Sequence, residues 1–358
     1  MSPSATLALR CARGIGAAGF RRLVDETGSP DAALSSLDAD VRTEAWERAA
    51  RVASVAQARG IVILESGRAS YPPSLADLED APPVMFALGD LTLLARPAVA
   101  IVGTRDATAY GLRTTRALAA AASSAGVTVV SGLARGVDAC AHRAALEGSG
   151  RTIAVLGTGV DVAYPLENRA LHAEVAARGL LLSEALPGTR AHPGSFPRRN
   201  RIIAALADVV LVTEAGLKSG ARITAEHAAQ MGRVLAAVPG PVDVASSAGT
   251  NALLRDGAHL VAGADDLLGL VHLTARGRGT TAAAVPGAGL SANPALAPDE
   301  RAVLDALAFG PRLPDELLSA TNLPAPVLAA ALATLGMLGL TEVDPAGTVR
   351  AGASGSVR

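Results

Sequence analysis

The residues best suited to bind an anionic ligand lie in one stretch, from Ser183 to Gly240. Four arginines fall within twelve residues of it, with no acidic residue among them: Arg190, Arg198, Arg199 and Arg201. Phe196 and Asn200 lie inside this run, and Lys218, the only lysine of the chain, follows it. Guanidinium groups suit phosphates, and an aromatic ring can stack on any nucleobase. We therefore interpret the run as a basic loop that lines a groove for single-stranded nucleic acid.

The spacing of this run is equally typical of a second arrangement. In that arrangement Phe196 is buried under a sheet, and the arginines form a face that only water contacts. The spacing alone does not choose between the two arrangements, so both remain open at this point.

Short apolar runs alternate with alanine-rich helical patterns from residue 98 onward. The apolar runs span residues 98–102, 127–130, 152–156, 180–182, 209–212 and 234–238. Helical patterns lie between them, as at 114–124 and 221–231. Buried strands joined by helices predict a mostly parallel sheet covered on both faces, which is a Rossmann-like α/β fold. In such sheets ligands bind beyond the carboxyl ends of the strands.

The turns that follow three of these runs hold the remaining candidate ligand contacts. These contacts are Gly103, Arg105, Gly132, Lys218 and Ser219. Glycine lets a backbone approach a ligand closely, and the N–H groups at the start of a helix favour anions. For Arg105, a solvated side chain in a tight turn is an equal alternative. Asp138 is better explained as a helix cap than as a catalytic group.

No set of residues with a catalytic spacing is present. The six histidines are scattered, and the spacings of histidine and cysteine that bind metals are absent. After residues 152–156, Val162 stands where a dinucleotide-binding fingerprint needs glycine, and the turn at 216–219 lacks the full spacing of a P-loop. We therefore expect no enzyme activity, no cofactor and no metal ion.

Composition divides the chain into four parts. Residues 1–65 have helical patterns around a Gly-Ile-Gly turn, which predicts a small domain of the SAM or helix-hairpin-helix kind, although the turn itself is better explained as an ordinary helix start that contains glycines. Residues 66–274 form the Rossmann-like core, although 61–89 is rich in proline and is interpreted as an irregular linker. Residues 275–297 are mostly Gly, Ala and Pro and predict a flexible linker. Residues 298–358 predict three short helices and a β-hairpin, as in a winged helix.

The distribution of charge limits where nucleic acid can bind. The formal net charge is −1, so only a local patch can attract a polyanion. Residues 298–350 hold three arginines against seven acidic residues, a net charge of −4. Phosphates would repel a winged helix with this charge, so we expect it to contact a protein instead.

The compartment is also suggested by composition. Two cysteines without a CxxC spacing are typical of a reducing cytosol. Arginines interrupt the first apolar residues, and no uncharged run reaches the length that spans a membrane. We expect a cytoplasmic protein that does not enter a membrane.

Eight motifs in the central region resemble those of the DprA/Smf family, the family of DNA-processing protein A. They are GTRDATAYG (103–111), SGLARGVDACAH (131–142), GTGVDVAYPLEN (157–168), SEALPG (183–188), FPRRNRIIAAL (196–206), EAGLKSGARITAEHA (214–228), GRVLAAVPGPV (232–242) and SAGTNALLRDGAHLV (247–261). Together they cover most of residues 60–265 in the order of that family. The parts on either side resemble its helical N-terminal and winged-helix C-terminal domains more weakly.

The resemblance implies a core that binds single-stranded DNA without sequence preference. It also implies a homodimer that protects incoming single strands and loads the RecA recombinase during natural transformation. By motif match, the resemblance also implies that the following residues contact DNA: Arg105, Gly132, Phe196, Arg199, Asn200, Arg201 and Lys218. Several relatives have a lysine shortly before the phenylalanine, but residues 191–195 of this chain contain none. Arg190 or Arg198 is the candidate to replace it.

A nucleotide phosphoribohydrolase is the alternative to a DNA-binding protein. Rossmann-like enzymes of that kind also place a glycine-rich turn and a Thr-x-Glu pair after a strand, and this chain has Thr224 and Glu226. Their PGGxGT loop is replaced here by EAGLKSGARIT at 214–224. We therefore favour DNA binding.

An apolar segment at residues 265–271 directly precedes the predicted linker and has no obvious partner within its own domain. The family that the chain resembles is dimeric. We therefore expect Leu267 and Leu268 to contribute to a self-complementary contact with a second copy of the chain.

Overall fold

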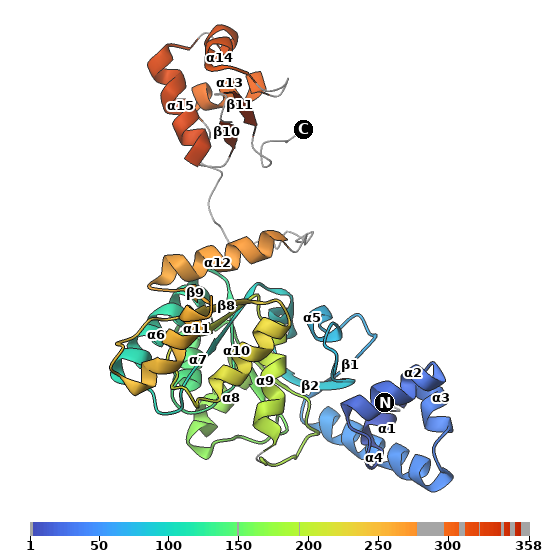
Figure 1. Ribbon diagram of the computed structural model, residues 1–358. Helices are drawn as coiled ribbons and strands as arrows, with labels where there is room; N and C mark the ends of the chain where they lie inside the picture. Colours follow the sequence, from blue (N-terminus) through green and yellow to red (C-terminus); the bar gives the residue numbers. More distant parts are fainter. Residues whose placement is uncertain are drawn as a thin grey trace. The chain divides into compact units, whose positions relative to one another are not determined.

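The computed structural model describes residues 3–148, 150–192, 194–277, 297–307, 312–321, 323–337, 340–343 and 348–351. The chain forms two compact units, Met1–Thr280 and Thr281–Arg358, which are coloured from blue to orange and from orange to red in Figure 1. Each unit has buried apolar clusters of its own. The larger unit contains all the predicted DNA contacts.

One sheet organises the larger unit, and nine strands form it in the described part of the chain. They are β1 (Val62–Glu65), β2 (Val84–Gly89), β3 (Ala98–Val102), β4 (Thr128–Ser131), β5 (Thr152–Leu156), β6 (Leu180–Ser183), β7 (Val209–Val212), β8 (Val234–Ala237) and β9 (His259–Leu260). Their order is β1-β2-β6-β5-β4-β3-β7-β8-β9. Pairs from β6 to β9 are parallel, whereas β2 pairs antiparallel with β1 and with β6. The predicted Rossmann-like, mostly parallel sheet is confirmed.

Helices cover both faces of this sheet, as Figure 1 shows. They are α6 (Ala109–Ser124), α7 (Val137–Glu147), α8 (Arg169–Arg178), α9 (Ser195–Leu206), α10 (Ala221–Gln230), α11 (Ala248–Arg255) and α12 (Ala264–Gly277). Side chains of a strand alternate between the two faces. Ala100 and Val102 of β3 belong to the apolar cluster that includes α9 and α10, whereas Val99 and Ile101 pack with α6 and α7. The central strands are apolar along their whole length for this reason.

Three arginines of the basic run, Arg198, Arg199 and Arg201, lie on a helix, α9, and not on the loop that the sequence predicts, whereas Arg190 precedes this helix. Pro197 is in its first turn, where the missing N–H of proline removes no helical hydrogen bond. The second half of the helix buries Ile202, Ile203 and Leu206 against the sheet. Arginine and proline occupy the first half, so the apolar stripe is too short to predict a helix. The consequence is that neighbouring arginines point to different sides.

The N-terminal residues form four helices, α1 (Ala5–Cys11), α2 (Ala17–Thr27), α3 (Pro30–Ser35) and α4 (Ala39–Ala58). Gly14 adopts a φ of 76°, and Gly16 precedes the first residue of α2, so the Gly-Ile-Gly turn starts a helix. These helices share an apolar cluster with β2 and α8. Arg59, directly after α4, also forms an ion pair with Asp161 of the core.

The interpretation of residues 61–89 as an irregular linker is wrong. This segment contributes β1, the short helix α5 (Pro73–Ala76) and β2 to the larger unit. Val84, Met85 and Phe86 are fully buried, because β2 lies between β1 and β6. Pro72 precedes α5 and Pro73 is its first residue, whereas Pro82 and Pro83 precede β2, so the prolines mark the starts of these elements.

The smaller unit contains α13 (Pro298–Leu307), α14 (Pro314–Thr321) and α15 (Ala325–Met337), followed by the antiparallel pair of β10 (Thr341–Val343) and β11 (Val349–Ala351). Val303, Leu317, Leu328 and Leu335 form its core. The predicted three helices and hairpin are therefore present. Of the predicted linker at 275–297, residues 275–277 belong to α12 and 278–296 lie outside the described residues.

The apolar segment before that linker has a partner within its own unit, contrary to the sequence-based expectation. It lies on α12, and Leu267 and Val271 are buried in the apolar cluster that includes α6 and β7. Leu268 is half-buried against the same cluster. Leu267 has an exposed fraction of 0%, so it is not available to a second copy.

The length and apolar character of a helix decide whether it could cross a membrane. In the described ranges, no single helix is both long enough and apolar enough to cross a membrane. The segments Pro314–Thr321 and Ala325–Gly336 reach that length and apolar character only when they are taken together, and a bend of 110° separates them.

His142 of α7 links the loop after β4 to the first residue of β5. Its Nε2 accepts a hydrogen bond from the backbone N–H of Leu133 (3.3 Å), so the proton is on Nδ1, which donates to Thr152 Oγ1 (2.7 Å). Thr152 in turn donates to the carbonyl of Val129. Burial, together with the charges of Arg199 and Arg143, lowers the pKa of His142 to about 3. The ring is therefore neutral in the folded protein.

The neutral state of His142 makes stability depend on pH. Between pH 6.5 and about 3 the unfolded chain binds a proton on this ring that the folded chain does not, so acidification favours unfolding. We expect this residue to lower the free energy of unfolding by about 1.4 kcal/mol per pH unit below 6.5. Urea denaturation of the wild type and His142→Gln at several pH values measures the effect. The stability advantage of the wild type should shrink as pH falls, and a constant advantage contradicts the assignment.

Candidate nucleic-acid interface

Seven of the ten predicted DNA contacts line one cavity at the carboxyl edge of the sheet. β3 and β7 are neighbours there, but the chain leaves β3 toward β4 and leaves β7 toward β8 on the other side. The two outgoing loops separate at this switch point, where sheets of this class bind ligands. The cavity has a volume of about 790 Å³. Its walls include Gly103, Arg105, Tyr164, Phe196, Arg199, Asn200, Lys218 and Ser219.

An aromatic side chain lies in the wall of this cavity, as the groove interpretation requires. Phe196 is half-buried and its ring centroid is 5.2 Å from that of Tyr164, with an angle of 30° between the planes. The guanidinium carbon of Arg105 lies 5.7 Å from the Phe196 centroid, which is a cation–π distance. Two aromatic rings and a guanidinium group thus come together from the first turn of α9 and from the loops after β5 and β3.

Arg199 forms the floor of the cavity. Its exposed fraction is 6%, and its Nη1 donates to the carbonyls of Gly132 (2.7 Å) and Val155. Burial lowers the pKa of Arg199 to about 10, and the charge of Asp138 opposes this shift. The side chain therefore stays charged at neutral pH. It lines the cavity from within the wall and does not extend into solvent.

Gly132 leaves room for the side chain of Arg199. A Cβ atom at position 132 would overlap the guanidinium group of Arg199. The N–H of Gly132 donates to Asp138 Oδ2 (3.2 Å), as does the N–H of Ala134 (3.4 Å). The backbone of Gly132 is thus engaged within the protein, and Gly132 is not among the residues that line the cavity. Its structural role is to make room for Arg199.

Gly103 has a similar packing role, although it does line the cavity. A Cβ at this position would overlap Val137 at the start of α7 and the carbonyl of Glu214 after β7. The loop after β3 is further held by the N–H of Thr104, which donates to that carbonyl (2.7 Å). The loops after β3 and β7 are therefore tied together below the cavity and separate above it.

The loop after β7 brings Lys218 and Ser219 to the opposite wall. Lys218 is exposed, and among the described residues neither it nor Arg105 forms an ion pair. Asn200 Nδ2 lies 3.5 Å from the carbonyl of Gly220, at the limit of a hydrogen bond. Asn200 thus links α9 to this loop, and two uncompensated cations face the cavity.

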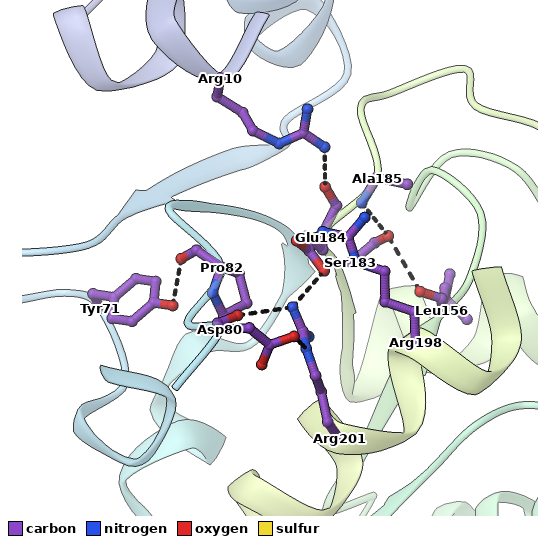
Figure 2. Close-up of polar contacts among 10 residues, drawn as sticks. All are labelled: Arg10, Tyr71, Asp80, Pro82, Leu156, Ser183, Glu184, Ala185, Arg198 and Arg201. Carbon is purple, nitrogen blue, oxygen red and sulfur yellow. Dashed lines mark hydrogen bonds and ion pairs between the residues drawn. The ribbon is translucent and has the colours of Figure 1, made fainter. Parts of the chain in front are cut away.

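Arg198 and Arg201 do not line the cavity, unlike their neighbours in sequence. Figure 2 shows both side chains beside Glu184, which follows β6. Arg198 Nη2 is 2.7 Å from Glu184 Oε1, and Arg201 Nη2 is 3.0 Å from Glu184 Oε2. Arg201 also forms an ion pair with Asp80 and has an exposed fraction of 4%. The expected DNA contact of Arg201 therefore has no support in this structure, because its charge is already neutralised inside the protein.

Sequence reasoning missed two residues of this region. Tyr164 lies in the turn after β5 and lines the cavity, and an aromatic residue in such a turn is a usable signal once the strand order is known. Asp138 was expected to cap a helix, but its carboxylate holds the preceding loop and faces Arg199. Burial raises the pKa of Asp138, and Arg199 opposes this shift.

Metal binding has no candidate site in the described part of the chain. No group of three or more histidine, cysteine or acidic side chains there could hold a metal ion. The cations, glycines and aromatic rings around the cavity are instead the groups that contact phosphates and nucleobases.

Comparison with known proteins agrees with this chemistry. The model of the DNA recombination-mediator protein A family matches residues 62–272, and that of the DprA winged helix domain matches residues 290–347. A Mycobacterium tuberculosis protein with the provisional name DNA processing protein DprA is 45% identical over 266 residues, which are 73% of this chain and 67% of the relative.

Two solved structures are also similar. The X-ray structure of DNA processing protein A (DprA) from Streptococcus pneumoniae matches with a TM-score of 0.66 and 32% identity, over 75% of this chain and 98% of that one. A structure of DNA processing protein A from Helicobacter pylori, described for its mode of binding single-stranded DNA, matches with a TM-score of 0.54 and 34% identity, over 61% and 96% of the chains. The chain therefore belongs to the DNA recombination-mediator protein A (DprA) family, as its motifs suggested.

Proposed function

We propose that this protein binds single-stranded DNA without sequence preference in the cavity between β3 and β7. The observation that carries the proposal is the convergence of Phe196, Arg105 and Lys218 on one cavity of about 790 Å³. An aromatic face tolerates any base, and the two cations are free to hold phosphates on either side of it. The relative from Helicobacter pylori, whose structure is described for single-stranded DNA binding, supports the same assignment.

The contribution of the cations can be measured through the salt dependence of binding. Lys218→Ala should weaken binding to all sequences alike and flatten the slope of log affinity against log salt by about 0.7. Arg96→Ala is the matched control, because Arg96 precedes β3 and lies at the opposite edge of the sheet. Fluorescence anisotropy with a labelled dT oligomer at several salt concentrations gives both quantities. Equal slopes for the two variants would remove Lys218 from the interface.

Strand preference follows from the same geometry. Phe196 needs an unstacked base, so the cavity should favour single strands over duplex DNA. Phe196→Ala should lose roughly 1–3 kcal/mol of binding free energy on the dT oligomer. In thermal denaturation the variant should stay folded, because the ring is only half-buried. Parallel losses of stability and binding would support the buried-core alternative.

A recombination role for the bound strand is the finer part of the proposal. We infer that the protein protects incoming single strands and loads the RecA recombinase onto them during natural transformation, as the family resemblance implies. Adding the protein to single-stranded DNA covered by a single-strand-binding protein should speed the onset of RecA ATP hydrolysis. Lys218→Ala should reduce this effect in proportion to its loss of DNA affinity. Undiminished DNA binding without any acceleration of RecA would contradict this part alone.

Assembly into a homodimer also belongs to the proposal, but its surface must differ from the one first expected. Leu267 is buried, whereas Leu273 of the same helix and Leu260 of β9 have exposed fractions of 68% and 57%. We expect Leu260→Arg combined with Leu273→Arg to give a folded monomer in light scattering, because both changes place charge on exposed apolar sites. A dimer that persists in this double variant would place the interface elsewhere.

The phosphoribohydrolase alternative receives less support from the site. Thr224 lines the cavity, but Glu226 is exposed on α10 and is not among the lining residues described here. An acid that contacts no cavity-bound ligand cannot serve as its general acid or base. Release of adenine from AMP by the purified protein would restore this alternative.

A further inference from the structure

α9 has two functional faces. Phe196, Arg199, Asn200 and Ile203 line the cavity, and their spacing of three, one and three residues places them on one side of a helix. Arg198 and Arg201 are three residues apart and project from another side toward Glu184, as Figure 2 shows. The rotation of α9 about its own axis therefore decides which arginines face the cavity.

Glu184 is well placed to fix that rotation. It follows β6 directly, and the side chain of Ser183 anchors this strand end by donating to the carbonyl of Thr158 (2.6 Å). Each oxygen of the Glu184 carboxylate pairs with a different arginine of α9, at 2.7 Å and 3.0 Å. Because these two ion pairs lie about one helical turn apart on α9, they resist rotation of the helix about its axis more than a single ion pair would.

The rest of the cluster strengthens this attachment. Arg201 Nε is 2.6 Å from Asp80 Oδ2, so the loop between α5 and β2 holds the same arginine from the other side. Arg10 of α1 donates to the carbonyl of Glu184 (3.3 Å). The residue before α9 is Gly194, which has no side chain to cap the helix. The ion pairs with Glu184 thus supply an orientation that the start of the helix does not.

We propose that Glu184 is a positioning residue for the DNA interface: by pairing with Arg198 and Arg201, it holds α9 so that Phe196 and Arg199 face the cavity. This inference rests on the proposed function. It assigns to Glu184 a role in binding although Glu184 is not among the residues that line the cavity, and it explains why the arginine run serves two purposes.

The test is a double-mutant cycle on the full chain, with binding of a labelled dT oligomer measured by anisotropy. The variants are Glu184→Gln, which keeps the size of the side chain but removes its charge, Phe196→Ala and the combination. Phe196→Ala should weaken wild-type binding about tenfold. In the Glu184→Gln background it should weaken binding less than about threefold, because the ring is no longer held in place.

Glu174→Gln is the matched control, because it removes an exposed ion pair with Arg178 on α8. In that background the tenfold effect of Phe196→Ala should persist. If the effect also persists in the Glu184→Gln background, the proposal is wrong. If the wild type does not bind the oligomer at all, the proposed function fails and this inference fails with it.

A second variant keeps the proposal testable if Glu184→Gln does not fold. Arg198→Met removes one of the two pairs at a side chain that is 48% exposed, so the fold should tolerate it. A positioning role predicts weaker binding with an unchanged salt slope. A slope flattened by about 0.7 would instead show that Arg198 contacts a phosphate directly, and it would overturn the assignment.

Discussion

One buried guanidinium group holds the candidate interface together. Arg199 lies where α9, the loop after β4 and the end of β5 meet, and it donates to a carbonyl of each of the latter two. The charge is tolerated in this buried position because Asp138 faces it and because backbone carbonyls accept its hydrogen bonds. Gly132 leaves the space that it occupies. The floor of the cavity, the packing of α9 and the course of the loop after β4 therefore depend on the same side chain.

A local interface explains how a chain of net charge −1 can have a cavity suited to a polyanion. Acidic residues neutralise the arginines that support the fold, as Glu184 and Asp80 do for Arg201. Arg105 and Lys218, on facing loops, have no such partner among the described residues. The distribution of acids among the arginines thus separates supporting cations from those available to a ligand.

Much of this arrangement could be predicted from the sequence. The division between cations that support the fold and cations available to a ligand could not. Continuous runs of valine, alanine and leucine predicted β3 to β8 because buried parallel strands need apolar side chains on both faces. Ligand-binding loops followed from the rule that binding occurs at the carboxyl ends of such strands. Arg198, Arg199 and Arg201 could not be told apart, since their directions depend on a helix whose first half has no apolar pattern. The burial of Leu267 was missed for a related reason: its partners on α6 and β7 are far away in sequence.

The loop after β7 gives the chain an unusual chemical property. Lys218 is its only lysine, and it is exposed in the wall of the cavity. A reagent that modifies primary amines therefore has a single side-chain target in these 358 residues. Labelling at this one position reports directly on whether the cavity is occupied, without any engineered residue, and a dye attached there would lie in the wall of the cavity.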